Sequence, residues 1–377
     1  MIVITTALMG ALEYIGAFGG SFLLAWLLTA WVRRLALKTG IVDRPDADPT
    51  RKIHRQPVPE LGGLAIFLTT AAGVGFFSIV NDQLLGGYLL PKHLIGVLLA
   101  GAVIMFGGYL DDRYHLGARQ QILFPIIAAA IVIVSGISVD YISNPFGDAI
   151  RLDTIQFTVF TWNDAPYSIT LWSDFFVFVW LMGMMYTTKF LDGLDGLAIG
   201  VGSIGALIVF FLSLTFEVGQ PETALLALLF AGAGIGFLMM NFNPARIFLG
   251  EGGSVFVGFW LGVLAIISGA KIATALLIMG IPILDVIWVI VRRVFFEKTS
   301  ATRADRKHLH FRLLDIGFSQ RQAVVFLYVL TATFGLTSLL LTGKAKVMSL
   351  VVLVAVMVVL GAAVVMQYRK RRATNDE

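Results

Sequence analysis

The sequence predicts an all-α polytopic membrane protein with about eleven transmembrane helices in one domain, residues 1–377. Two features carry this prediction. Hydrophobic residues make up 58% of the chain and charged residues 14%, and the mean hydropathy is +0.85, values that ordinary soluble domains do not reach. The apolar residues also form runs long enough to cross a bilayer as helices.

The apolar runs define the expected helices. They lie at 16–37, 62–80, 93–110, 120–138, 171–187, 197–216, 222–240, 253–270, 272–295, 322–341 and 346–367. No basic segment precedes the first run, so we expect a retained span rather than a cleaved signal peptide. Gly232 to Gly236, inside the seventh run, predicts a close-packing seam rather than a nucleotide loop. The chain has no cysteine, which excludes disulfides, thiolate metal sites and a catalytic thiol.

The basic residues predict how the chain is oriented. With the N-terminus outside, the inner segments hold every Lys and Arg except Lys92, Arg151, Lys271, Lys344 and Lys346. The positive-inside rule therefore predicts an outer N-terminus and an inner C-terminus. A loop at 296–321 and a basic tail at 368–377 are then cytosolic. The pI of about 9.3 is explained by this asymmetry, with no nucleic-acid partner.

The longest outer segment, residues 139–170, differs from the rest of the chain. Apolar and polar side chains alternate there from 154 to 159. Alternation of this kind is typical of a strand. We expect a small external β-hairpin with a structural role between the fourth and fifth helices.

Asp192 and Asp195 lie between the fifth and sixth runs, each followed by a glycine. They share a face if the backbone is helical, and the glycines let a ligand approach the main chain. This arrangement suits a divalent metal and phosphates. A polar turn that caps two helices is the alternative, and it is typical of a single Asp-Gly pair.

Two further acidic sites fall on the inner side. Asp111 and Asp112 end the third run, where adjacent carboxylates oppose the helix dipole unless a cation compensates. The alternative is a solvated helix end. Glu251 lies among glycines just before the eighth run, and an ordinary N-terminal cap by Ser254 or Glu251 itself is the alternative there.

The inner side also offers groups that attract anions. His308 and His310 alternate along the chain, so they project together if the backbone is extended, and they could bind metal or phosphate or simply be solvated. Helices that begin after 62–63, 119, 196 and 253 would point their N-termini at the same region. Four such helix starts and basic loops predict an anion pocket.

These motifs resemble the polyprenyl-phosphate N-acetylhexosamine-1-phosphate transferases of glycosyltransferase family 4. The resemblance covers about residues 33 to 325. The stretches that carry it are 40–46, 51–54, 59–63, 107–113, 192–198, 243–254 and 305–312. It implies ten or eleven helices around a cytosolic cleft in the cytoplasmic membrane. It also implies Mg²⁺-dependent transfer of a sugar 1-phosphate from a UDP-sugar to a polyprenyl phosphate.

The resemblance also implies roles for individual residues. The catalytic carboxylates are Asp111, Asp112, Asp192 and Asp195. Magnesium, with manganese as a possible substitute, would be held by Glu251 with help from Asp111 or Asp192. The substrate-binding residues are Lys52, His54, Lys189, Asn243, Phe248, Arg303, His308 and His310. Phe248 would stack on the uracil. The expected partners are polyprenyl phosphate and a UDP-N-acetylhexosamine, and a second copy of the chain in a homodimer is left open.

The motifs also narrow the branch of the family. His115 and the His-Leu-His-Phe stretch resemble enzymes that use UDP-GlcNAc and initiate envelope glycans such as teichoic acid or O-antigen. The alternative branch transfers phospho-MurNAc-pentapeptide for peptidoglycan synthesis. Three residues depart from the family pattern: Lys189 replaces Asn, Glu251 replaces Asp and Phe311 replaces His. We expect Lys189 and Glu251 to be a coupled adjustment within an active enzyme.

Two other classes of protein compete with an active transferase. An ion-coupled transporter should show inverted repeats and acids near the membrane midplane, but here only Asp285 lies in such a place. A structural or cleft-lining role is equally consistent with that residue, which follows Pro282 in the ninth run. An inactive relative that only binds lipid phosphate is the other possibility.

Overall fold

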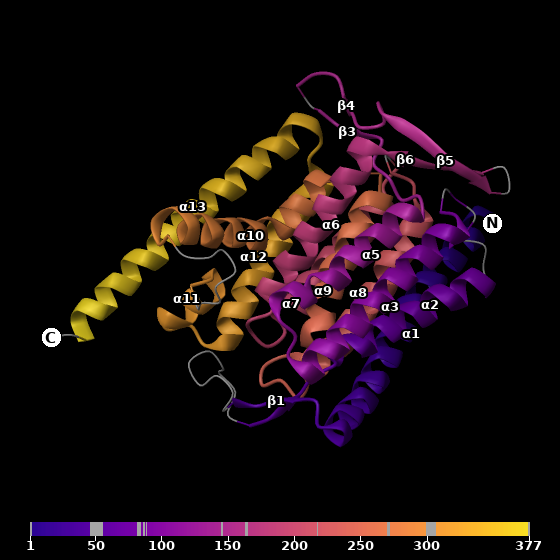
Figure 1. Cartoon of the computed structure of the whole chain (residues 1–377). Helices are drawn as coiled ribbons and strands as arrows, with labels where there is room; N and C mark the ends of the chain where they lie inside the picture. The colour runs from indigo at the N-terminus through magenta and orange to yellow at the C-terminus, as the bar shows by residue number, and fades with distance from the viewer. Residues whose placement is uncertain are drawn as a thin grey trace.

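Long helices dominate the computed structural model (Figure 1), which describes the chain except residues 1, 46–55, 81–83, 86, 88, 145, 163–164, 217, 270–271, 299–306 and 376–377. The helices are α1 (Ile2–Thr39), α2 (Gly62–Val80), α3 (Pro91–Tyr114), α4 (Ala118–Gln121), α5 (Leu123–Val134), α6 (Leu171–Leu191), α7 (Leu197–Ser213), α8 (Pro221–Asn241), α9 (Gly250–Ile267), α10 (Ile272–Val291), α11 (Leu309–Asp315), α12 (Gln320–Leu340) and α13 (Gly343–Asn375). A π-helical turn, Arg292–Phe296, continues α10.

The apolar helices confirm that this is an all-α, multi-pass membrane protein. Within the described residues, eight helices are long and apolar enough to cross a bilayer: Gly10–Thr39, Gly62–Val80, Pro91–Tyr114, Pro221–Asn241, Gly250–Ile267, Ile272–Phe296, Gln320–Leu340 and Gly343–Gln367. Two apolar helices, Ala118–Val134 and Leu197–Ser213, are shorter. The fourth expected run is divided between α4 and α5. The total of eleven spans and their orientation remain predictions.

Helices α8 and α9 form the centre of the bundle. In their most apolar windows 78% and 89% of the residues are buried, against 11% for α13, which projects away from the bundle in Figure 1. The glycine seam expected in α8 is confirmed. A Cβ atom at Gly232 would lie 2.6 Å from the Phe18 carbonyl oxygen, and one at Gly236 would lie 2.3 Å from that of Phe22. Small residues therefore let α8 pack closely against α1.

A glycine junction, Gly63, Gly108, Gly252 and Gly253, fixes the start of α9 against α2 and α3. A Cβ at Gly63 would lie 2.2 Å from the Gly253 Cα, and one at Gly108 would lie 2.2 Å from the Gly252 Cα. The main-chain N–H of Gly63 also donates to the Leu249 carbonyl at 2.8 Å. The three helices thus meet backbone to backbone.

Short strands occupy the two ends of the bundle (Figure 1). Antiparallel pairs form between β1 (Val42–Asp43) and β2 (Val58–Pro59), β3 (Tyr141–Ile142) and β4 (Ile150–Arg151), and β5 (Gln156–Trp162) and β6 (Ala165–Thr170). Strands β3 to β6 lie within the segment where we expect a hairpin, and β1 lies at the opposite end. The external position of β3 to β6 remains a prediction.

Candidate functional site

A cavity of about 1910 Å³ lies at the β1 end of the bundle and gathers most of the predicted site residues. Those that line it are Asp111, Asp112, Lys189, Asp192, Asp195, Asn243, Phe248, Glu251 and His308. They come from α3, α6, α9 and the segments after α6, after α8 and before α11. His310 does not line the cavity, and Lys52, His54 and Arg303 lie outside the described residues.

The predicted gathering of helix starts around one region is confirmed. Glu60 before α2, Ala118 in α4, Asp195 before α7 and Gly250 in α9 all line the cavity. Among the described residues, the wall holds more acidic than basic side chains, and the basic loops at 46–55 and 299–306 lie outside this comparison. Its carboxylates are Asp43, Glu60, Asp111, Asp112, Asp192, Asp195 and Glu251, and its Lys and Arg residues are Arg33, Lys189, Arg246 and Arg293. The described part of this surface would repel a diphosphate unless further cations accompany it.

The last turn of α3 and the first turn of α9 meet at this wall. Helix α3 continues through Asp111 and Asp112 to Tyr114, beyond the expected end of the run. Helix α9 begins at Gly250, so Glu251 lies within its first turn rather than before it. The Asp112 carboxylate accepts the Glu251 main-chain N–H at 3.0 Å. The N-terminus of α9 thus compensates a carboxylate that the α3 dipole disfavours, and Asp112 positions Glu251.

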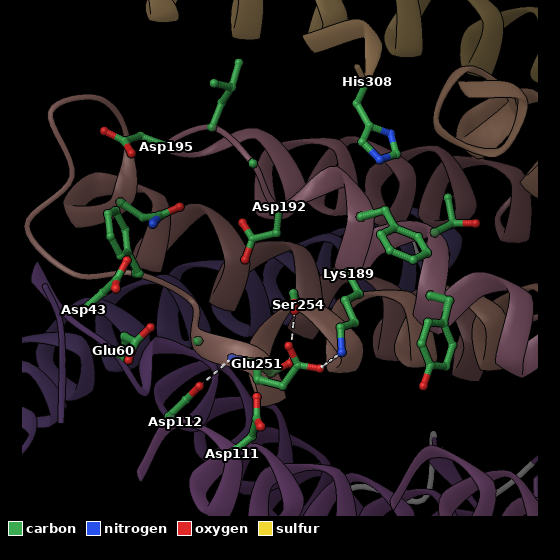
Figure 2. Close-up of a pocket in the computed structure, with 18 of the residues that line it drawn as sticks. Asp43, Glu60, Asp111, Asp112, Lys189, Asp192, Asp195, Glu251, Ser254 and His308 are labelled. Atoms are coloured by element: carbon green, nitrogen blue, oxygen red, sulfur yellow. Dashed lines mark hydrogen bonds and ion pairs between the residues drawn. The ribbon is translucent and has the colours of Figure 1, made fainter. Parts of the chain in front are cut away.

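A polar network crosses the cavity wall from Asp111 to Glu251. Asp111 accepts hydrogen bonds from the Leu116 N–H at 2.8 Å and the Gln121 amide at 3.0 Å. The Gln121 oxygen accepts from the Lys189 ammonium at 2.9 Å. Lys189 in turn forms an ion pair with Glu251, and Figure 2 shows these two side chains turned toward each other. Two of the three residues that depart from the family pattern are therefore direct partners.

The donor set fits a magnesium ion that is shared with a substrate. Within the described chain, no three or more His, Asp or Glu side chains form a group that could hold a metal by themselves. Mg²⁺, however, is commonly held by one or two carboxylates together with substrate phosphates and water. Glu251, with Asp111 near it in Figure 2, fits this smaller set. The larger set that adds Asp192 remains a proposal.

The turn between α6 and α7 separates its two carboxylates. The backbone at 192–196 is not helical, so Asp192 and Asp195 do not share a helix face. Asp195 accepts hydrogen bonds from the Asn243 amide at 2.8 Å and the Ala245 N–H at 3.0 Å. It therefore holds the segment that leads to Phe248. Among the described residues, no hydrogen bond reaches the Asp192 carboxylate, which points into the cavity in Figure 2.

The two glycines of this turn serve packing and backbone conformation. A Cβ at Gly193 would lie 2.2 Å from Nε2 of His310, so a protein side chain, rather than a ligand, approaches this main chain. Gly196 has φ +83°, which favours glycine. Burial lowers the pKa of His310 to about 3, His308 also lowers it, and Asp285 partly opposes this change. His310 is thus buried and uncharged beside Gly193, and its substrate-binding role remains a prediction.

Burial, together with the negative charges of Glu251, Asp195 and Glu60, raises the pKa of Asp192 to about 8. Between pH 4 and 8 the folded protein then binds more protons than the unfolded chain, so the free energy of unfolding falls as the pH rises. A tenfold change in a proton-binding constant is equivalent to about 1.4 kcal/mol. The Asp192→Asn variant should therefore be more stable than the wild type by a larger margin at pH 8 than at pH 5, measured by thermal unfolding. Asp148→Asn, at an exposed carboxylate, is the control; a pH-independent difference for Asp192→Asn would contradict the raised pKa.

Asp285 holds His308 at the edge of the cavity. Its carboxylate lies 2.8 Å from Nδ1 of His308 and accepts the Leu309 main-chain N–H at 2.8 Å. Asp285 itself does not line the cavity, which supports the structural alternative over the cleft-lining one. The rings of His308 and His310 stack at 5.7 Å between centroids. The backbone is extended at His308 only, and His310 already lies in the first turn of α11, so the rings stack across a helix start rather than along an extended chain.

Some cavity residues were not foreseen. Gln121 links Asp111 to Lys189, and Gln320 accepts the Asn243 amide at 2.7 Å. Each is a polar residue beside or within an apolar run, which is a weak signal in the sequence. Their partners lie 68 and 77 residues away along the chain, so only the fold reveals the contacts.

Comparisons with known proteins agree with this geometry. The model of glycosyl transferase family 4 matches residues 94–269. A probable undecaprenyl-phosphate N-acetylglucosaminyl 1-phosphate transferase of Bacillus subtilis (strain 168) is 30% identical over 89% of this chain and 87% of its own length. A decaprenyl-phosphate N-acetylglucosaminephosphotransferase of Mycolicibacterium smegmatis is 32% identical over 90% of this chain and 86% of its own length. An undecaprenyl-phosphate alpha-N-acetylglucosaminyl 1-phosphate transferase of Yersinia pestis is 28% identical, over 82% and 79%. The chain belongs to glycosyl transferase family 4.

Proposed function

We propose that this protein transfers GlcNAc-1-phosphate from UDP-GlcNAc to polyprenyl phosphate, which yields polyprenyl-diphosphate-GlcNAc and UMP and initiates an envelope glycan. The observation that carries the proposal is the single cavity to which distant acidic segments, Asn243 and Phe248 contribute together. The relatives that match most of the chain are named for transfer to undecaprenyl or decaprenyl phosphate, which supports this donor over UDP-MurNAc-pentapeptide.

The cavity wall suits an acceptor with a long apolar tail and a charged head. One side of it is apolar and comes from α6 and α10. The residues there include Phe176, Val179, Trp180, Ile283, Val286, Ile287 and Ile290. We place the prenyl chain along this side and its phosphate near Asp111. The positive-inside asymmetry of the sequence supports a site that faces the cytosol, where soluble UDP-sugars are found.

In the proposed reaction, an oxygen of the lipid phosphate bonds to the sugar-bearing phosphorus of the donor. The bond from that phosphorus to the bridging oxygen breaks, and UMP leaves with the electron pair. Asp111, held by Gln121 and Leu116, positions the lipid phosphate, which is already largely ionised near pH 7. Mg²⁺ bound through Glu251 would neutralise charge on the diphosphate. Asn243, held by Asp195, and Phe248 would contact the uridine.

The test uses purified protein with Mg²⁺, UDP-GlcNAc and polyprenyl phosphate. UMP release that depends on both substrates is the expected result. UDP-MurNAc-pentapeptide and UDP-GalNAc, assayed side by side, should be poorer donors. EDTA should stop the reaction, and Mn²⁺ should restore it at least in part. Uptake of a solute without UMP release would show a carrier instead, and binding of lipid phosphate without turnover would show an inactive relative.

We expect Asp285 to affect the rate of sugar-phosphate transfer by positioning His308. Asparagine at 285 can still accept the Leu309 N–H but offers His308 no charge, so the ring loses its fixed orientation. By analogy with the outer partners of metal-bound histidines, we expect the Asp285→Asn variant to lose about 10- to 100-fold in kcat. In a double-mutant cycle, Asp285→Asn should add little to His308→Ala. Fully additive losses would contradict a positioning role.

A further inference from the structure

Lys189 and Glu251 make contacts that bear on how a metal would enter the cavity. The Lys189 ammonium pairs with Oε1 of Glu251 and donates to Gln121 at 2.9 Å. It also lies 5.6 Å from the Tyr186 ring centroid. Both members of the pair are partly exposed to the cavity, with 19% and 21% of their side chains accessible. The pair is thus reachable by a ligand and not sealed in the protein core.

Glu251 cannot serve Lys189 and a divalent cation equally well. An ammonium and a metal ion at the same carboxylate would repel each other strongly at such short range. A metal that takes Glu251 must therefore displace Lys189. The displaced ammonium sits on a flexible four-carbon stem, and it needs another anion within reach. Two neighbouring carboxylates already have partners: Asp111 accepts from Gln121 and Asp112 accepts from the start of α9. Asp192 also lines the cavity, but it is a buried carboxylate among the negative charges of Glu251, Asp195 and Glu60.

A diphosphate in the cavity would supply that anion. We propose that Lys189 is an exchangeable counter-ion: it pairs with Glu251 until a nucleotide diphosphate binds, and it moves to the diphosphate when the metal takes Glu251. This inference rests on the proposed function, because it assigns the diphosphate of the donor to this cavity. Its consequence is that Lys189 couples metal binding to nucleotide binding.

A permanent structural ion pair is the competing explanation, and UDP binding without metal separates the two. In EDTA, Glu251→Gln should free Lys189 for the diphosphate and tighten UDP binding at least fivefold. The same substitution in a Lys189→Met background should tighten UDP binding by a clearly smaller factor, because only the loss of one negative charge remains and no ammonium is left to be freed. Comparing the two backgrounds in a double-mutant cycle subtracts the change in UDP affinity that comes from losing one negative charge in an acidic cavity. Equal tightening in both backgrounds would overturn the proposal.

A second experiment measures Mn²⁺ binding in the absence of nucleotide, with electron paramagnetic resonance as the readout. It tests whether Lys189 competes with the metal for Glu251. Lys189→Met should tighten Mn²⁺ binding at least tenfold, because the competitor for Glu251 is gone. Arg113→Gln is the matched control. It also removes one positive charge, and Arg113 is exposed and donates to the Thr39 carbonyl at 3.0 Å rather than to Glu251. Similar tightening in both variants, or in neither, would overturn the proposal.

The two measurements also separate this inference from the proposed function. If no variant binds UDP with or without Mn²⁺, the proposed donor is wrong and the exchange onto a diphosphate falls with it. If UDP binds but the cycle shows no coupling, only the exchange is wrong. Thermal unfolding shows whether each variant is folded. Should Lys189→Met not fold, Lys189→Gln, which removes the same charge and keeps a donor, takes its place in both measurements.

Discussion

Replacing Gly63 by alanine is expected to lower the rate of transfer at least about 100-fold, the size of loss that a displacement of about 1 Å can cause at a catalytic centre. The added methyl group would lie 2.2 Å from the Gly253 Cα and 2.5 Å from its nitrogen. Both are main-chain atoms, so no side chain can turn aside. Helix α2 must move away from α9, and Glu251 in the first turn of α9 moves with this contact.

Gly75 provides the matched control on the same helix. A Cβ at this position would meet nothing within 4 Å, so Gly75→Ala adds the same methyl group to α2 without a clash. Transfer activity and the thermal unfolding temperature should be measured for both variants. Overpacking typically costs about 1–3 kcal/mol, so Gly63→Ala should also unfold at a lower temperature. A Gly63→Ala variant with the activity of Gly75→Ala would show that the helices do not meet at this point.

The sequence identifies the helices well and their ends at the cavity poorly, and α3 shows why. The apolar run stops at 110, where the charged residues begin, but the hydrogen-bonded helix continues to Tyr114. Hydropathy marks where a helix leaves an apolar layer. It does not mark where main-chain hydrogen bonds stop. The same difference places Glu251 inside α9, although the glycines beside it indicate a loop.

The glycines beside the carboxylates show a second limit of prediction from the sequence. In the sequence, a glycine beside a carboxylate predicts room for a ligand. In the structure, Gly252 and Gly253 admit the backbones of α3 and α2, and Gly193 admits the His310 ring. Small residues permit any close approach, and a single sequence does not say which partner approaches. The carboxylates at the ends of the apolar runs were easier to place, because Asp111, Asp112, Asp192, Asp195 and Glu251 all line the same cavity, while their catalytic roles remain predictions.

The pairing of Lys189 with Glu251 shows what a departure from a family pattern can reveal. The resemblance predicts an adjustment between two positions that are 62 residues apart in the sequence, and the structure places the two side chains in contact. Gln121 extends this pair to Asp111. A lysine that meets a carboxylate inside one network is the contact that a coupled adjustment within an active enzyme predicts.

Replacing Glu251 by glutamine is expected to reduce kcat by about 10³-fold, a loss typical of the removal of one strong electrostatic contributor at an active site. Glutamine keeps the shape of the side chain and loses only the charge, so the packing at the glycine junction is preserved. Glu251→Asp keeps the charge with a shorter reach and should retain part of the activity. UMP release at saturating substrates measures both variants, and thermal unfolding shows that they are folded.

If Lys189 and Glu251 changed together, the effect of Glu251→Asp should depend on the residue at 189. Aspartate at 251 leaves the Lys189 ammonium without its partner at the right distance, and asparagine at 189 removes the unpaired cation. The double variant Lys189→Asn, Glu251→Asp should therefore turn over at least as fast as either single variant. Residues in direct contact commonly show such non-additive effects. Losses that simply add in the double variant would mean that each residue acts alone, and the two departures would then be independent changes at one cavity.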